Sequence, residues 1–282
     1  MPEGDTLART AAVLRAVLEG RTITAARGRP GGAPVERLTG QTVVSVEAVG
    51  KHLLVGTRDG LTLHTHLAMR GSWHRYRAGE PWRRSAGSAV AVLEVPGAVA
   101  VCFSAPTVEV LETRVLAVHP VLSRLGPDLL DETFDAERAL RRLRDPVRSN
   151  MAVGDALLDQ GAVAGIGNVY RSEVCFLESV DPFAPVGTLD DMTLRRLLGR
   201  SRDLLRANLG GPFRTTVSGS LDGWPGPMPA RVRGERVWVY GRTGRPCRRC
   251  GSLIRSRASG PLARRVYWCP RCQAGAQAVA GV

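Results

Sequence analysis

The chain has 282 residues, 44% of them hydrophobic, which is long enough for about two domains with a sizeable core. Its net charge of +13, from 39 basic and 26 acidic residues, favours a polyanionic partner such as nucleic acid over a basic protein without one. No run of about 18 apolar residues is present, which excludes a membrane-spanning helix. The first residues lack the apolar core of a secretion signal, so we expect a protein of the reducing cytoplasm, where cysteines serve as thiols or metal ligands.

The first elements predicted along the chain are one helix and a series of short strands. Residues 4–20 place apolar side chains at helical spacing and end at a glycine, which is typical of a capped helix. Residues 42–112 form short runs rich in Val, Leu and Thr, separated by Gly, Pro and Asp at intervals of about ten residues. This pattern predicts an antiparallel β-sandwich or barrel of about six to eight strands. Residues 1–120 are therefore predicted to form an N-terminal domain.

Beyond residue 120 the period of the apolar residues changes from about 2 to about 3.6, which indicates a domain boundary. Helices are predicted within residues 131–145, 151–161, 167–179 and 190–210. Residues 121–230 are therefore predicted to form a helical domain, whose last part is a Gly- and Pro-rich loop.

Four cysteines near the C-terminus have the spacing of a structural zinc site, C-x2-C-x18-C-x2-C. They are Cys247, Cys250, Cys269 and Cys272. Four thiolates fill the tetrahedral coordination of zinc, so one structural ion is expected; two unrelated cysteine pairs are the alternative. The segment between the pairs alternates as a β-hairpin does, with a turn near residues 259–261. Nine arginines and no acidic residue lie between residues 242 and 272, so residues 231–282 are predicted to be a basic zinc-finger module that binds nucleic acid.

Three residues in the N-terminal half of the chain are candidates for a catalytic role. Lys51 is the one lysine among the 39 basic residues. Removal of the initiator methionine would expose Pro2 as a secondary amine, and an α-amino group has a pKa of about 8 against about 10.4 for lysine. The neutral, nucleophilic form of that amine is therefore more populated at neutral pH, and such amines form Schiff bases. Glu3 beside it could supply a proton, although a chain that begins with Met-Pro is weak evidence alone.

Together these segments resemble the formamidopyrimidine-DNA glycosylase / endonuclease VIII family. The matching pieces are "MPEGDT", "VGKHLL" around Lys51, "LDQGAVAGIGNVYRSEV" from Leu158 to Val174, and "YGRTGRPCRRCGS…RRVYWCPRCQ". They follow the family's order from residue 2 to 273, and the third resembles the family's helix–two-turns–helix motif. The resemblance implies an α+β fold with an N-terminal helix plus antiparallel β-sandwich, a helix–two-turns–helix domain and a C-terminal zinc-finger β-hairpin.

The resemblance also implies a base-excision-repair DNA glycosylase with abasic-site lyase activity. Pro2 would attack C1′ of the damaged nucleotide and leave a Schiff base, and Glu3 would protonate the sugar. Lys51 would hold a phosphate beside the lesion, and Arg264 would bind the phosphates at the lesion from the zinc hairpin. A rival interpretation makes Lys51 the Schiff base, but burial would have to lower its pKa by several units.

Further residues are implied as contacts to double-stranded DNA. Asn168 would bind phosphate at the start of its helix, where backbone N–H groups favour an anion. Met69 would fill the gap left by the extruded base, which offsets part of the cost of flipping. His66 and Arg70 would contact the DNA near Met69. A core position for Met69 and a helix cap for Asn168 are the alternatives.

Departures from the family pattern bear on the substrate. Thr6 stands where many members have Glu, and Asp5 before it is a possible substitute. The segment "FSAPTVEVLE" lacks the Arg and Phe that purine-type members insert, and with "MPEGDT" and "YWCP" this favours the endonuclease VIII branch and oxidised pyrimidines. The role of residues 218–234, where purine-type members carry a base-capping loop, stays open.

Three functional alternatives remain beside that prediction. They are an enzyme that is mainly an abasic-site lyase, a glycosylase of oxidised purines, and a DNA-binding protein without catalysis. In each case we expect a monomer without membrane attachment, in the cytoplasm with the nucleoid.

Overall fold

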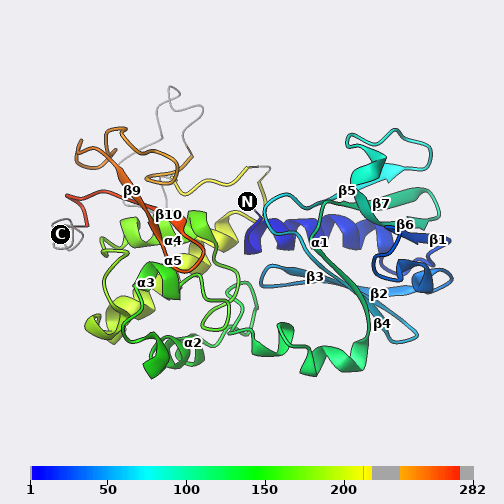
Figure 1. The fold of residues 1–282 in the computed structure, drawn as a ribbon, viewed down its shortest axis with the longest axis horizontal. Helices are drawn as coiled ribbons and strands as arrows, with labels where there is room; N and C mark the ends of the chain where they lie inside the picture. Colours follow the sequence, from blue (N-terminus) through cyan, green and yellow to red (C-terminus); the bar gives the residue numbers. More distant parts are fainter. Residues whose placement is uncertain (1, 212, 218–235, 274–282) are drawn as a thin grey trace. The chain divides into compact units, whose positions relative to one another are not determined.

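The computed structural model describes residues 2–211, 213–217 and 236–273 (Figure 1). The chain divides into two compact units, residues 1–125 and residues 126–282. Among the described residues no helix is long and apolar enough to cross a membrane.

Residues 1–125 form one helix and eight strands. The helix is α1 (Gly4–Leu18) and the strands are β1 (Ala25–Gly28), β2 (Val43–Val49), β3 (His52–Thr57), β4 (Leu61–His66), β5 (Ser72–Arg77), β6 (Ala89–Val95), β7 (Ala98–Phe103) and β8 (Thr107–Glu112). The strands make two antiparallel sheets, ordered β1-β6-β7-β5 and β2-β3-β4-β8. The predicted helix followed by an antiparallel β-sandwich is confirmed.

The core of this unit lies between the two sheets and under α1. Strand residues alternate between the two faces of a sheet, so Leu53 and Val55 of β3 and Leu63 of β4 turn inward and are fully buried. They pack with Leu93 of the other sheet and Leu14 of α1 in one apolar cluster. The residues that alternate with them, such as His52 of β3 and His64 of β4, lie on the outer face of their sheet, as does Glu109 of β8. Four short 3₁₀ helices complete the unit: η1 (Val35–Leu38), η2 (Ala86–Ser88), η3 (Thr113–Val118) and η4 (Leu122–Arg124).

Residues 126–282 contain helices and a two-stranded hairpin. The helices are α2 (Ala136–Leu143), η5 (Pro146–Arg148), α3 (Val153–Ala156), α4 (Asn168–Leu177), η6 (Val186–Thr188) and α5 (Asp191–Ala207). The strands β9 (Arg255–Ser259) and β10 (Arg264–Trp268) pair antiparallel, as predicted, with Arg264 opposite Ser259. Residues 218–235, most of the predicted Gly/Pro-rich loop, lie outside the described residues.

Two predicted helices are shorter in the structure, and side chains explain both. The side chain of Asp135 accepts from the backbone N–H of Arg138, so α2 begins after Asp135 rather than near residue 131. In the segment 151–161, Asp159 accepts from the N–H of Gly161 through its Oδ1 at 2.8 Å. Such a local bond replaces helix continuation by a turn, so only α3 is helical there.

Candidate functional site

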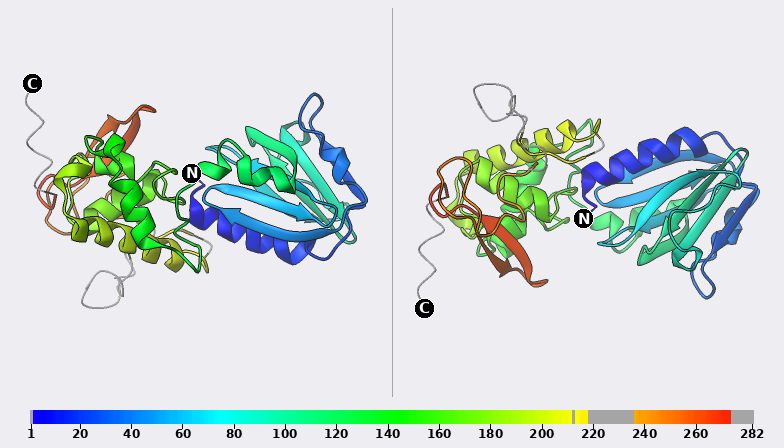
Figure 2. Two further views of the ribbon diagram at one scale, coloured as in Figure 1. Left: turned by 90° about the horizontal axis from the view of Figure 1, so that it is seen from below. Right: turned by 90° about the horizontal axis from the view of Figure 1, so that it is seen from above.

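The start of the chain lies at the same end of residues 1–125 as the turn that carries Lys51. The N–H of Gly20 donates to the carbonyl of Val43 at 2.9 Å, and the guanidinium of Arg15 donates to the carbonyl of Val46 at 2.6 Å. Helix α1 therefore runs antiparallel to β2. A helix rises about 1.5 Å and a strand about 3.3 Å per residue, so the residues before α1 reach the end of β2. Figure 2 shows the N-terminus and the β2–β3 turn at one end of the sheet.

Lys51 occupies the second position of a two-residue hairpin between β2 and β3. Gly50 takes the first position with φ of +58°, a conformation that glycine adopts without strain, and His52 pairs with Val49 across the turn. The turn type therefore places the single lysine of the chain at the tip of a rigid hairpin, half-buried.

Acidic side chains gather at the first turn of α1. Glu3 is the residue before the helix and is fully buried, and its carbonyl accepts from the N–H groups of Thr6 and Leu7. Asp5 is also fully buried and forms an ion pair with Arg9 at 3.3 Å. Acids at a helix N-terminus are stabilised by the helix dipole. The Asp5 carboxylate is therefore held by Arg9 within the first turn of α1.

The loop after β4 presents a methionine to solvent. The N–H of Gly71 donates to the carbonyl of Leu67 at 2.8 Å, and a Cβ on Gly71 would lie 2.5 Å from that oxygen, so the tight loop requires glycine there. Ala68 takes a φ of +47°, which is strained for a residue with a side chain. Met69 between them is 64% exposed. The alternative in which Met69 is a core residue is therefore wrong.

His66 and Arg70 flank this loop. His66 ends β4 and lies directly opposite His52 in the β3–β4 ladder, with ring centroids 4.8 Å apart. Arg70 is exposed, and its carbonyl accepts from the guanidinium of Arg84 at 3.2 Å. Both residues therefore belong to the end of the sheet that carries Lys51.

In residues 126–282, Arg171 connects helix α4 to the hairpin. Its guanidinium is fully buried and donates to the side-chain oxygen of Asn168 at 2.8 Å, to the carbonyl of Arg264 at 2.9 Å and to the carboxylate of Asp155. The Nδ2 of Asn168 donates to the carbonyl of Arg265 at 3.1 Å. Asn168 and the backbone of Arg264 are therefore fixed in one network.

Glu173, two residues further along α4, anchors the segment that leads to the hairpin. Its buried carboxylate accepts from the backbone N–H groups of Trp238, Val239 and Tyr240 at 2.7 to 2.9 Å, and from the hydroxyl of Thr216. Burial raises the pKa of Glu173, and the four donors oppose that rise.

The four cysteines of the predicted zinc site converge. The Sγ atoms of Cys247, Cys250, Cys269 and Cys272 all lie within 4.8 Å of one another. A tetrahedral zinc with Zn–S bonds of about 2.3 Å separates its sulfurs by about 3.8 Å. The Cys247–Cys272 and Cys250–Cys269 sulfurs are 3.9 and 3.4 Å apart, and backbone N–H groups approach two of the sulfurs at 3.4 Å. The donor set and its geometry therefore fit zinc.

Within the described residues, the predicted site residues thus fall into two groups, one in each unit of the chain. Pro2, Glu3, Lys51, His66 and Met69 share one end of residues 1–125. Asn168, Arg264 and the four cysteines lie within residues 126–282.

Sequence reasoning missed the side chains that hold the second group, namely Arg171, Glu173 and Asp155. A signal was present. Arg171 and Glu173 stand in α4 between the apolar residues Val169, Tyr170, Val174, Cys175 and Phe176, which occupy several faces of the helix and so indicate a helix that is buried all round.

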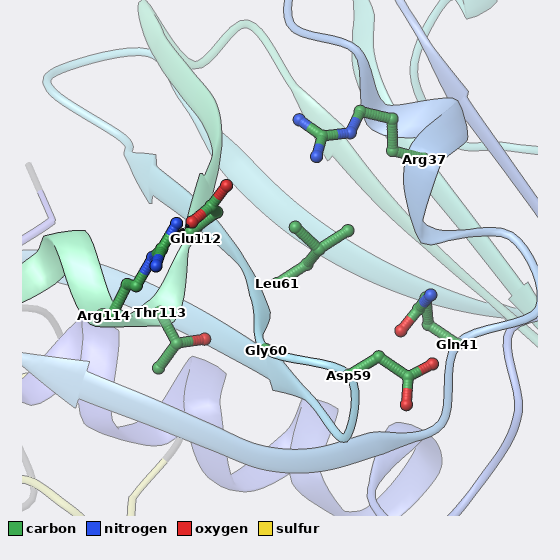
Figure 3. A pocket seen from close by; sticks show the side chains of 8 residues that line it. All are labelled: Arg37, Gln41, Asp59, Gly60, Leu61, Glu112, Thr113 and Arg114. Atoms are coloured by element: carbon green, nitrogen blue, oxygen red, sulfur yellow. Dashed lines mark hydrogen bonds and ion pairs between the residues drawn. The ribbon is translucent and has the colours of Figure 1, made fainter.

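A shallow pocket of residues 1–125 lies away from these groups (Figure 3). Its lining residues are Arg37, Gln41, Asp59, Gly60, Leu61, Glu112, Thr113 and Arg114. It is built on the β3–β4 turn, and that turn is at the opposite end of β3 from Lys51. The pocket is therefore separate from the predicted catalytic end.

Two family models match the chain. The model of the formamidopyrimidine-DNA glycosylase N-terminal domain matches residues 1–105, and the model of the formamidopyrimidine-DNA glycosylase H2TH domain matches residues 125–216.

Curated relatives match along nearly the whole chain. Probable endonuclease 8 2 of Streptomyces coelicolor is 43% identical over 282 residues, which cover 98% of this chain and 95% of that protein. A DNA-(apurinic or apyrimidinic site) lyase of Mycolicibacterium smegmatis is 40% identical, with 97% and 99% covered. Endonuclease 8 2 of Mycobacterium tuberculosis is 41% identical, with 97% and 100% covered.

Among solved structures, the Lactococcus lactis Fpg in complex with DNA that contains N7-benzyl-Fapy-dG has a TM-score of 0.78. It is 23% identical, with 96% of this chain and 99% of that chain covered. The same enzyme bound non-covalently to abasic-site DNA also has a TM-score of 0.78 at 23% identity, with the same coverage. These likenesses show the fold.

Proposed function

Because the chain belongs to the formamidopyrimidine-DNA glycosylase / endonuclease 8 family, we propose that it is a base-excision-repair DNA glycosylase with abasic-site lyase activity. The observation that carries the proposal is the antiparallel run of α1 along β2. It brings Pro2 and Glu3 to the end of the sheet where Lys51 forms the hairpin tip. An N-terminal amine, an acid and a phosphate-binding cation thus share one end of the sandwich.

Pro2 is the nucleophile in this proposal. Its amine attacks C1′ of the damaged nucleotide, the bond to the base breaks, and the base leaves with its electron pair. Glu3 protonates the sugar ring oxygen, so the ring opens to a Schiff base on Pro2. Loss of a C2′ proton then expels the 3′ phosphate, and a second elimination expels the 5′ phosphate. At neutral pH an α-amine is neutral roughly a few hundred times more often than a lysine amine, which favours Pro2 over Lys51.

Two cations and one amide side chain hold the DNA backbone. Lys51 suits a tight contact with one phosphate, because its ammonium is a compact point charge. Arg264 extends from β10, and its backbone is tied to Arg171. Asn168 begins α4, where N–H groups and the helix dipole favour an anion, and its side chain also braces Arg265. The affinity for DNA should therefore fall steeply as salt rises.

Met69 takes the space of the extruded base. A base within a duplex hides C1′, so the nucleotide has to be flipped out, at a cost of a few kcal/mol. An apolar side chain inserted into the stack offsets part of that cost. The exposure of Met69 on a tight loop supports this role, and His66 and Arg70 beside it contact the flanking backbone.

One zinc ion held by the four cysteines is part of the proposal. When bound there it supplies a structural cross-link and no open coordination position, so the ion takes no part in the chemistry. We assign the catalytic part to residues 1–120, the helix–two-turns–helix part to residues 121–230 and the zinc hairpin to residues 231–282. A DNA-repair role would place the protein, as a monomer, with the nucleoid.

The proposed substrates are oxidised pyrimidines in double-stranded DNA. Support comes from the relatives named endonuclease 8 and from residues 104–112, "SAPTVEVLE", which follow the buried Phe103 and hold neither the Arg nor the Phe of purine-type members. A second candidate is an enzyme that mainly cleaves abasic sites. It is favoured by the relative named as a lyase and by Thr6 in place of Glu.

Borohydride trapping tests the proposal. Duplexes with thymine glycol, 8-oxoguanine or an abasic site are incubated with protein whose Met1 is shown to be removed, and the linked peptide is mapped by mass spectrometry. A crosslink at Pro2 with the thymine glycol duplex is expected. A crosslink with the abasic duplex alone would establish the second candidate. Tight binding without any crosslink would contradict both, and a crosslink mapped to Lys51 would overturn the Pro2 assignment.

A further inference from the structure

A buried chain of histidines runs across the outer face of the sheet β2-β3-β4-β8. His52 of β3, His64 of β4 and Glu109 of β8 lie on that face, with His64 directly opposite Glu109 in the ladder. His119 approaches them from the link between η3 and η4. All three imidazoles are buried. Buried polar rings of this kind are retained where they are hydrogen-bonded.

The hydrogen-bond network assigns one tautomer to each ring. The Nδ1 of His119 accepts from the backbone N–H groups of Val121 and Leu122 at 3.3 and 3.2 Å, so its proton is on Nε2 and is donated to Glu109 Oε2 at 3.1 Å. The Nδ1 of His64 lies 2.7 Å from the same oxygen and donates to it. Its Nε2 is then an acceptor for the Nδ1–H of His52 at 2.8 Å. One carboxylate thus orders three neutral imidazoles.

A metal ion is the competing interpretation of the same cluster. The ligand atoms of His64, Glu109 and His119 lie within 4.8 Å of one another, and two imidazoles with one carboxylate are a zinc donor set. To ligate through Nε2, His119 would have to carry its proton on Nδ1. Two backbone N–H groups already point at Nδ1. The surroundings of His119 therefore favour the hydrogen-bonded histidine network over a metal site.

The last ring of the hydrogen-bonded histidines, His52, lies beside the proposed DNA-contacting residues. His52 follows Lys51 in the sequence and lies opposite His66, with the two rings 4.8 Å apart. The pKa of His52 is lowered to about 3, chiefly by burial and to a smaller extent by neighbouring groups, among them His66 and Lys51. His52 is therefore neutral at physiological pH.

We propose that Glu109 is a positioning residue. Through His64 it holds His52 as a neutral ring packed against His66 and next to Lys51, and so fixes two side chains that contact the DNA backbone. This inference rests on the proposed function for the role of Lys51 and His66. The ring order itself, and its effect on DNA binding, can be measured without any turnover.

The test compares Glu109→Gln with Glu112→Gln in the full-length zinc-loaded protein. Both variants lose one negative charge from β8, but Glu112 pairs with the exposed Arg114 and contacts no histidine. Glu109→Gln removes the charged acceptor of His64 and His119, so its Kd for a duplex with a stable abasic analogue should rise about tenfold. The rate of Schiff-base trapping at saturating DNA should stay within about twofold, and Glu112→Gln should match the wild type in both.

Imidazole ¹⁵N spectra of the wild type supply a readout that does not depend on a variant's folding. They should show the proton on Nδ1 of His52 and His64 and on Nε2 of His119. A proton on Nδ1 of His119 would overturn the proposal, as would an equal Kd for the two variants. A second zinc ion per chain that is lost in Glu109→Gln would establish the metal site instead. If the wild type binds DNA with the expected Kd difference but traps none, the positioning role stands and the proposed function fails.

Discussion

Arg171 and Asp155 form an ion pair inside residues 126–282, with the Arg171 side chain 0% and the Asp155 side chain 14% exposed. Asp155 also accepts from the hydroxyl of Ser259 at 2.6 Å, at the tip of the hairpin. Gly260 after it has no side chain to clash, because a Cβ there would lie 2.9 Å from Oδ1 of Asp155. The pair therefore links α3, α4 and the turn between β9 and β10. The geometry of this hairpin is thus set in part by a buried ion pair.

Replacing Arg171 by Met should destabilise residues 126–282 strongly. The variant leaves the Asp155 carboxylate without its guanidinium, and breaking a buried pair in this way costs about 3 to 5 kcal/mol. Urea denaturation of the full chain, followed at the tryptophans of this unit, measures the change. Arg195→Met is the matched control, because its ion pair with Glu137 is exposed and should contribute little. Equal effects of the two variants would contradict the central role of Arg171.

Much of the fold could be predicted because its signals are local. Cysteine spacing predicts the four-cysteine cluster, and strand alternation and helical periodicity predict the order of elements. The outer-face histidines could not be assigned in the same way. His64 meets Glu109 only because β4 and β8 pair in one particular register, and the two residues are 45 positions apart in the chain. Strand register at such separations leaves no local pattern.

The candidate site was predictable where a residue type is unusual, as with the single lysine at the tip of β2–β3. The residues that hold the candidate site residues in place, such as Arg171, could not be predicted. Arg171 looked like one of many arginines, and its burial follows from the packing of α4 against the hairpin. The length of α3 was wrong in the prediction because the side chain of Asp159 forms a turn that periodicity does not register.

Met69→Ala should separate catalysis from stability. The side chain is 64% exposed, so the free energy of unfolding should change by less than about 0.5 kcal/mol. Excision should slow by about tenfold or more, because the flipped nucleotide loses its apolar plug while flipping still costs a few kcal/mol. Single-turnover kinetics on a thymine glycol duplex measures the rate. Met192→Ala, at an equally exposed position of α5, is the control, and a matching loss there would refute the plug.

Cys269→Ser should release zinc and weaken DNA binding while residues 1–125 stay folded. Cys269 is fully buried, and the serine oxygen replaces one of four sulfur ligands. The zinc content, measured by metal analysis, should fall from one ion per chain to a small residual. Cys102→Ser is the control, with the opposite expected outcome. The Cys102 thiol is buried in the core between the sheets, where burial raises its pKa. This variant should therefore keep its zinc and lose stability. Unchanged DNA affinity in zinc-free Cys269→Ser would count against the hairpin as a DNA contact.

Acidification should destabilise the protein through His52. The folded ring has a pKa of about 3 against an ordinary value of 6.5, so between these pH values the unfolded chain binds a proton that the folded chain does not. Stability is therefore fully present above pH 6.5 and falls as the pH drops, by about 1.4 kcal/mol between pH 7.5 and 5.5 from this ring alone. His52→Gln keeps a donor toward His64 without the titration. Denaturation at the two pH values should show a smaller loss in the variant by that amount, and equal losses would show that His52 is protonated in the folded chain.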